Sequence, residues 1–155
     1  VTSALALHTA PIVIQSIDGI SLQAATCCHP VPGDRIIGQM RGGHGLSIHR
    51  MDCETARKQI SRDAERWIDV EWDEEVSGMF RTLIEITADD ERGILGRIAS
   101  EITASNADIL QVAMDTESEQ VAIIRFTLQV QDRDHLAEVF RRLRKLPQTR
   151  TITRA

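Results

Sequence analysis

The 155-residue sequence predicts an α+β protein made of two modules, a small α/β module followed by a ferredoxin-like βαββαβ domain. The net charge changes sign along the chain: residues 27–66 hold seven basic and five acidic side chains, whereas residues 67–155 hold eleven and seventeen. Between two regions of regular apolar patterning lies an acidic run that ends in Ser77 and Gly78. Segments of opposite charge favour separate modules, and we expect them over residues 1–76 and 77–155.

The second module is predicted from its apolar periodicity. Alternating or helically spaced apolar residues mark six segments, in chain order a strand, a helix, two strands, a helix and a strand. They are residues 81–88, 93–105, 108–116, 120–130, 134–146 and 149–153. Asn106 and Pro147 are expected to end the two helices. This order is the ferredoxin-like arrangement, with two helices on one face of a four-stranded antiparallel sheet. The first helix is expected to bury Ile94, Leu95, Ile98 and Ile102.

The first module has shorter segments. Two short strands are expected within residues 11–25, around the turn signal Asp18-Gly19. Three further strands are expected over residues 35–40, 46–50 and 66–72. The glycine-rich stretch between the first two of these lets the backbone turn tightly. Asp52 is the expected N-cap of a helix over residues 53–62, since its carboxylate can accept a first-turn backbone N–H.

Composition excludes several classes of protein. No apolar run approaches the ~18 residues that a membrane span needs, which predicts a soluble protein without membrane contact. The first residues lack the basic region and cleavage site of a signal peptide. Because the chain begins at Val1 and not at Met, we expect a piece of a longer protein. Three cysteines are too few for a disulfide-stapled secreted domain, which favours a reducing cytoplasm where thiols can bind metal.

Four side chains of the first module are candidate metal ligands: Cys27, Cys28, His49 and Cys53. They form two pairs, as in many tetrahedral zinc sites. Adjacent residues on a strand point to opposite faces, so both Cys27 and Cys28 can reach one ion only if the chain bends there. Two other interpretations stay open at this point. The cysteines could be buried structural residues without a metal, or Cys27 or Cys28 could be a nucleophile activated by His49.

The remaining histidines have simpler interpretations than metal binding, whereas Gly93 has two possible roles. His8 and His135 are expected to face solvent, and His44 is expected to be a turn residue. Gly93 stands at the first strand-to-helix junction of the second module. It either lets a ligand approach the N–H groups at the helix start or only makes the turn.

Three motifs together resemble a known family. The stretches "CCHPVPGDRIIG", "GHGLSIHRMDC" and "ADDERGIL" are similar to those in the C-terminal regulatory part of the bacterial RelA/SpoT-type (p)ppGpp synthetases and hydrolases. The likeness extends from about Ile12 to Arg154. It implies that the first module is a zinc-finger-like or ribosome-intersubunit domain and that the second is an ACT domain.

The resemblance also implies roles for particular residues. Zinc would be held by the four candidate ligands named above. The RNA-contact candidates become Arg35, Arg41, Arg50, Arg57 and Lys58. In ACT domains the first strand-to-helix loop binds small molecules, most often amino acids. Here a branched-chain amino acid would meet Asp90, Glu91, Arg92, Gly93, Ile94 and Leu95, with Ile109 lining its pocket. Glu91 and Arg92 depart from the flanks that are frequent beside the loop glycine.

The function implied is regulation in the stringent response. The family's GTP pyrophosphokinase and (p)ppGpp hydrolase domains lie upstream of these residues, so we expect no activity from this chain alone. Expected partners are those catalytic domains, the ribosome with its rRNA and tRNA, and a second ACT domain. Dimerisation would use helices or a sheet edge, such as the strand over residues 120–130 if it lies at one. The alternatives are a stand-alone amino-acid-binding ACT regulator and a cysteine-dependent enzyme.

Overall fold

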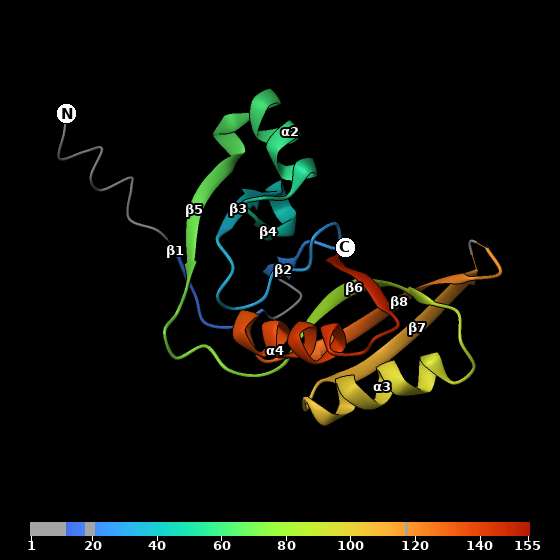
Figure 1. The fold of residues 1–155 in the computed structure, drawn as a ribbon. Coiled ribbons are helices and arrows are strands. Elements are labelled where there is room, and N and C mark those ends of the chain that lie inside the picture. Colours follow the sequence, from blue (N-terminus) through green and yellow to red (C-terminus); the bar gives the residue numbers. More distant parts are fainter. Residues whose placement is uncertain (1–11, 18–20, 117) are drawn as a thin grey trace. The chain divides into compact units, whose positions relative to one another are not determined.

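The computed structural model describes residues 12–17, 21–116 and 118–155, and its elements are drawn in Figure 1. The chain divides into two compact units between Gly78 and Met79, and each unit has a sheet of its own. The predicted α+β class and the ferredoxin-like order of the second unit are confirmed. In the described part of the chain no helix is long and apolar enough to cross a membrane.

The first unit is a five-stranded mixed sheet in the order β1-β5-β3-β4-β2. Its strands are β1 (Ile12–Ile14), β2 (Leu22–Ala24), β3 (Ile36–Met40), β4 (Leu46–Arg50) and β5 (Trp67–Trp72). Its helices are η1 (Gly42–His44), α2 (Glu54–Arg62) and η2 (Ala64–Arg66). The central strand β3 runs antiparallel to both neighbours, whereas the two edge strands are added in parallel.

The two strands predicted within residues 11–25 exist but do not form a hairpin. β1 pairs with β5 and β2 pairs with β4, so they lie at opposite edges of the sheet. The turn signal at Asp18 and Gly19 lies outside the described residues. A local turn motif therefore did not decide which strands pair here.

A tight connection between β3 and β4 holds the β2 edge in place. Gly45 has a positive φ of 79°, and a Cβ there would lie 2.4 Å from the carbonyl oxygen of Ser21. That oxygen accepts a hydrogen bond from the N–H of Leu46 at 2.8 Å. Only glycine allows so close a backbone approach, so the glycine-rich turn positions β2 and the residues that follow it.

Two buried clusters stabilise the first unit. The larger one lies within the sheet and consists of Ile14, Ile36, Leu46, Ile48 and Val70. The smaller one lies under α2 and consists of Ala25, Cys28, Cys53 and Ala56, with Trp67 packed against it. Two of the candidate metal ligands are therefore part of the core of this unit.

The second unit is a four-stranded antiparallel sheet in the order β7-β8-β6-β9 with two helices. Its elements are β6 (Phe80–Asp89), α3 (Ile94–Ala104), β7 (Asp108–Thr116), β8 (Val121–Val130), α4 (Arg133–Arg144) and β9 (Thr149–Arg154). Alternate residues of β6 and β8 are buried, as the periodicity predicts. β8 lies inside the sheet and not at an edge, so the edges are β7 and β9.

Two expectations about side chains of the second unit are wrong. Leu95 lies outside the core and is 37% exposed, whereas Ile94, Ile98 and Ile102 are buried. His135 is half-buried and does not simply face solvent. Its Nδ1 accepts from the N–H of Gln131 at 3.0 Å, which leaves Nε2 to donate to the carbonyl oxygen of Ser105 at 2.6 Å. His135 thus links the start of α4 to the end of α3. His8, in contrast, lies outside the described residues.

Candidate metal centre

The structure brings all four candidate ligands together in the first unit. One donor atom from each of Cys27, Cys28, His49 and Cys53 lies within 4.8 Å of every other. The two adjacent cysteines lie in a turn after β2, His49 lies near the end of β4, and Cys53 is the N-cap residue of α2. Three separate parts of the chain therefore converge on one point.

A local bend solves the problem of the adjacent cysteines. The N–H groups of Cys28 and His29 both point to the carbonyl oxygen of Ala25, at 3.4 and 2.9 Å. His29 has a positive φ of 46°, which turns the chain sharply after the pair. Because Cys27 and Cys28 stand in a turn and not in a strand, they can aim their thiols at the same site. A second turn, closed by Asp34, follows at residues 31–34.

The start of α2 differs from the sequence-based expectation. The N-cap is Cys53 and not Asp52, and the helix has no side-chain cap. Asp52 is exposed in the preceding turn, and its carboxylate lies 3.5 Å from Nε of Arg50. The first turn of α2 therefore begins at a candidate metal ligand, where a carboxylate cap was expected.

Four of the six distances between donor atoms fit a tetrahedral zinc ion, and the other two are at most 4.8 Å. Zinc–sulfur and zinc–nitrogen bond lengths imply about 3.8 Å between two sulfurs and about 3.5 Å between sulfur and nitrogen in a tetrahedral site. The Sγ atom of Cys27 lies 3.9 Å from that of Cys28 and 3.6 Å from that of Cys53. Nδ1 of His49 lies 3.4 Å from Sγ of Cys27 and 3.9 Å from Sγ of Cys28. Three thiols and one imidazole are also donors that zinc prefers.

Neighbouring groups orient the four ligands. Nε2 of His49 lies 3.5 Å from Oγ of the buried Ser47, so a proton on Nε2 leaves Nδ1 free to face the thiols. The backbone N–H of Arg50 donates to Sγ of Cys28 at 3.3 Å. The ring of Trp67 packs against that of His49 with centroids 5.2 Å apart. The sequence analysis missed Ser47, although its position two residues before His49 on one strand indicates a shared face.

The electrostatics of the site favour neutral imidazole and a thiolate at the helix start. Burial lowers the pKa of His49, which keeps its ring neutral at physiological pH. Burial raises the pKa of Cys28 to about 12. Burial also opposes ionisation of Cys53, but the N–H of Ala56 and the neighbouring thiols outweigh it and lower the pKa of Cys53. Neutral imidazole and a stabilised thiolate are the forms that bind metal.

The cysteine-nucleophile interpretation finds less support in this geometry. Burial raises the pKa values of Cys27 and Cys28, so neither thiol is activated. A thiol protonated at neutral pH is a weak nucleophile. Cys53 has a lowered pKa, but its side chain is buried. The four groups face one another, which suits a closed structural site better than a catalytic one.

The loop at Gly93 has the backbone that the ligand-approach interpretation requires. Gly93 is the N-cap of α3 with a φ of 83°, and a Cβ there would meet nothing within 4 Å. Around it, Asp90, Arg92 and Leu95 are exposed. Ile94 is buried in the core, and the carboxylate of Glu91 accepts from Nε2 of Gln148 at 3.0 Å. Ile109, the predicted pocket residue, pairs with Leu128, which pairs with Thr82, so it lies at the other end of the sheet from this loop. The space above the helix start is therefore open.

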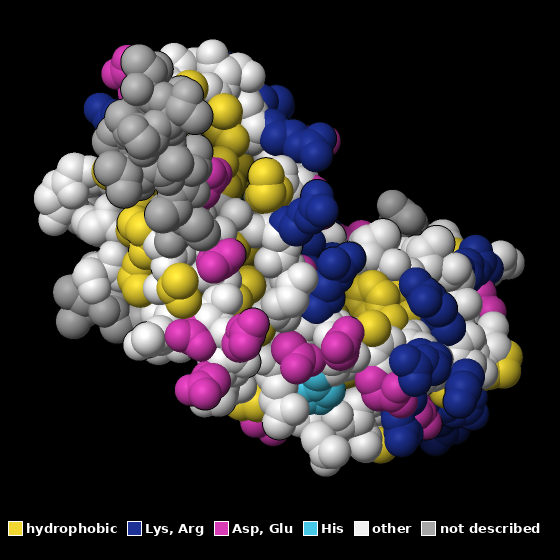
Figure 2. Space-filling model, turned by 90° about the vertical axis from the view of Figure 1, so that its left-hand side faces the viewer, with side chains coloured by type: hydrophobic (Ala, Val, Ile, Leu, Met, Phe, Trp, Pro, Cys, Tyr) yellow, Lys and Arg dark blue, Asp and Glu magenta, His cyan; other side chains and the backbone are white. Residues whose placement is uncertain are grey.

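The five RNA-contact candidates lie on the surface of the first unit. Arg35, Arg41, Arg57 and Lys58 are exposed, and Arg50 is half-buried beside Asp52. Figure 2 shows the Lys and Arg side chains, together with Asp and Glu side chains, on one face of the molecule. Nε of Arg57 donates to the carbonyl oxygen of Met51 at 3.3 Å, which fixes that side chain close to the strand β4.

Two family descriptions match this chain in succession. The RelA/SpoT RIS domain matches residues 12–73, and the ACT domain matches residues 77–154. A solved ACT domain from GTP pyrophosphokinase of Chlorobium tepidum is 20% identical, covers 50% of this chain and 100% of its own, and superposes with a TM-score of 0.46.

Curated relatives are much longer proteins. The GTP pyrophosphokinase of Streptomyces coelicolor is 35% identical over 133 residues, which are 86% of this chain and 16% of the relative. The GTP pyrophosphokinase of Escherichia coli K12 is 30% identical over 88% of this chain and 18% of its own length. The bifunctional (p)ppGpp synthase/hydrolase SpoT of E. coli K12 is 31% identical over 91% of this chain and 20% of its own length. The chain thus spans a fifth or less of these relatives.

Proposed function

Since the chain belongs to the RelA/SpoT family and carries its RIS domain and an ACT domain, we propose that it is the regulatory part of a (p)ppGpp synthetase/hydrolase. It senses the state of the ribosome and the supply of amino acids in the cytoplasm, and it controls catalytic domains elsewhere in the same polypeptide. The observation that carries the proposal is the succession of the two domain matches within relatives of which the chain spans 16–20%. A stand-alone ACT regulator has less support, because those relatives are far longer.

The experiment compares the full-length polypeptide with a form that lacks residues 1–155 of the present numbering. Synthesis and hydrolysis of (p)ppGpp are measured with and without ribosomes that carry uncharged tRNA. We expect the shortened form to keep a basal activity and to lose its response to ribosomes. An unchanged response would show that control lies in another part of the protein.

In the first unit the zinc ion has a structural role. Cys27, Cys28, His49 and Cys53 would supply all four ligands, which leaves no open position for catalysis. The ion would tie the turn after β2, the end of β4 and the start of α2 to one point. These are also the segments that carry Arg50, Arg57 and Lys58. The metal thereby fixes the geometry of the basic surface that contacts ribosomal RNA and tRNA.

In the second unit an amino acid binds at the loop of Gly93. Its carboxylate would meet the N–H groups at the start of α3, where the helix dipole favours negative charge. The apolar side chain of a branched-chain amino acid would pack on Leu95, which is exposed beside the loop. The positive φ of Gly93 and the open space beside it support this site.

Replacing Gly93 with valine is expected to abolish binding of valine, leucine and isoleucine, because the added side chain fills the approach to the helix start. The matched control is Gly78→Val. Gly78 also has a positive φ, of 110°, and open space around it, but it lies between the units. The backbone strain of the two variants is therefore comparable. Calorimetric titration checks the prediction on variants with native circular dichroism. A wild-type protein that gives no heat with any of the three amino acids would remove the sensor role.

The second unit is expected to self-associate through the edge strand β7. Leu110, Val112 and Met114 on β7 are 43, 41 and 41% exposed, and the free edge offers unpaired backbone groups. Changing Val112 and Met114 to aspartate should convert a dimer into a monomer, whereas Thr151→Asp on the opposite edge strand β9 should not. Light scattering on the 155-residue chain measures the mass. A monomeric wild type at high protein concentration would rule this interface out.

A further inference from the structure

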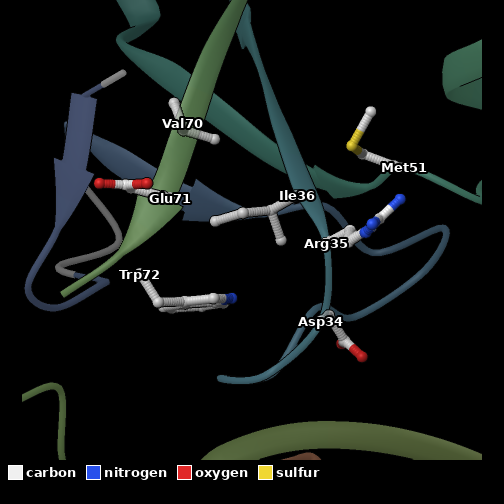
Figure 3. A pocket seen from close by; sticks show the side chains of 7 residues that line it. All are labelled: Asp34, Arg35, Ile36, Met51, Val70, Glu71 and Trp72. Atoms are coloured by element: carbon white, nitrogen blue, oxygen red, sulfur yellow. The ribbon is translucent and has the colours of Figure 1, made fainter. Parts of the chain in front are cut away.

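A pocket of about 310 Å³ lies in the first unit, between the ends of β3 and β5 and the turn after β4. Figure 3 shows Trp72 and Val70 on β5 at one end, Ile36 in the middle, and Arg35 with Met51 at the other end. None of these five residues is a candidate metal ligand or part of the Gly93 loop. The sequence analysis did not find the pocket, because its walls come from three distant segments.

The inner wall of the pocket is apolar and partly aromatic. Ile36 and Val70 are buried, Trp72 is half-buried, and Met51 is 48% exposed. The volume lies at the small end of the range for ligand pockets, ~300–1,000 Å³. An indole ring and a thioether are good partners for another flat ring. The pocket thus suits a group of the size of one or two fused rings.

Two arginines lie beside Met51 at one side of the pocket. The N–H of Met51 donates to the carbonyl oxygen of Arg35 at 2.8 Å, and Nε of Arg57 donates to the carbonyl oxygen of Met51 at 3.3 Å. The backbone of Met51 is thus joined to the backbone of Arg35 and to the side chain of Arg57. Both arginines are exposed, and Arg35 lines the pocket. Two carboxylates, those of Asp34 and Glu71, also line the pocket. Asp34 is buried and accepts from the N–H of Val31, and Glu71 points away from Ile36 and Trp72 in Figure 3.

We propose that this pocket binds one unstacked nucleobase of single-stranded RNA, with the flanking phosphates on Arg35 and Arg57. The inference rests on the proposed RNA contact of the first unit and adds a site to it. A nucleotide combines a flat ring with an anionic backbone, and the pocket combines an aromatic wall with Arg35 in its lining and Arg57 beside Met51. An acidic peptide would use the arginines but not the ring of Trp72. Duplex RNA keeps its bases stacked and would use only the charge.

The first test uses the unaltered 155-residue protein and a 12-nucleotide single-stranded oligoadenylate. The chain has only two tryptophans, Trp67 and Trp72, so two indole N–H signals are expected in a ¹H–¹⁵N spectrum. Addition of the oligonucleotide should shift the Trp72 signal and leave the Trp67 signal in place. The same strand in a duplex should shift neither. RNA binding without any change at Trp72 would overturn the pocket and leave the RNA contact standing.

The second test compares two substitutions of the same residue by fluorescence anisotropy with the labelled oligonucleotide. Trp72→Leu keeps apolar volume but removes the ring, and affinity should fall by about tenfold or more. Trp72→Phe keeps a ring and should lose much less. The control Arg66→Ala removes a positive charge that is already paired with Asp63. Equal affinities of the two Trp72 variants would contradict base stacking. No binding by the wild type even at low salt would overturn both the pocket and the proposed RNA contact.

Discussion

Replacing Cys53 with alanine is expected to abolish zinc binding and the cooperative unfolding of the first unit. This substitution removes one of four ligands that join the turn after β2, the strand β4 and the helix α2. The binding free energy of a structural zinc ion acts as folding free energy, on the order of 10 kcal/mol in zinc-finger peptides. Among the described residues, the sheet core of this unit has five buried apolar residues with four partly buried ones packed against them, and the smaller cluster contains two of the ligands themselves. Loss of the ion therefore exceeds what the remaining core can compensate.

Tryptophan fluorescence reports this unit alone, because both tryptophans of the chain belong to it. The ring centroids of Trp67 and His49 lie 5.2 Å apart, so the emission of Trp67 responds directly to the candidate zinc site. We expect the thermal transition seen by tryptophan to disappear in Cys53→Ala and in the wild type treated with a chelator. The control is Ile98→Ala in the second unit. It removes a fully buried side chain there, at a cost of ~2–5 kcal/mol, and should leave the tryptophan transition in place. A Cys53→Ala protein with a wild-type transition would show that the fold holds without the site.

Reversing the charge of Arg57 and Lys58 together is expected to weaken binding to ribosomes by about tenfold to a hundredfold at low salt. Both side chains are exposed on α2 next to the candidate zinc site. Each phosphate contact that is lost also makes ribosome binding less sensitive to salt. The slope of the logarithm of the binding constant against the logarithm of the salt concentration should therefore fall in magnitude by about two.

The matched control places the same charge change on the second unit, as Arg92→Glu with Arg97→Glu. These two arginines are exposed as well, and the net charge of the two double variants is identical. Cosedimentation with ribosomes over a series of salt concentrations measures both the affinity and its salt dependence. Equal losses in the two variants would mean that overall charge, and not the basic surface of the first unit, controls docking.

The fold of the second unit was predictable because its signals repeat over long elements. β6 and β8 pair over ten positions, and one face of each strand is buried throughout. Alternation of apolar residues cannot tell which strand is a neighbour of which, so the placement of β8 inside the sheet needed the structure. Helical spacing alone also placed Leu95 in the core, although the first turn of α3 leaves it exposed.

The first unit was harder to predict because its strands are short and its contacts distant. β1 and β2 have three residues each, and each gains its partner from far along the chain. The ligand types and their spacing predicted which side chains could converge, and the structure brings them together. The prediction that Asp52 caps α2 was wrong, because the carboxylate of Asp52 lies near Arg50 and the N-cap residue is Cys53. No sequence pattern could reveal the pocket at Trp72, which exists only after three segments meet.

The central claim is that a zinc ion organises the first unit, and the metal content of the protein tests it most directly. The protein is purified without chelator, and native mass spectrometry measures its mass with bound metal. We expect one zinc per chain in the wild type and none in Cys53→Ala, because three remaining ligands leave the tetrahedron incomplete. Less than about a tenth of an equivalent of zinc in a folded wild-type protein would contradict the account.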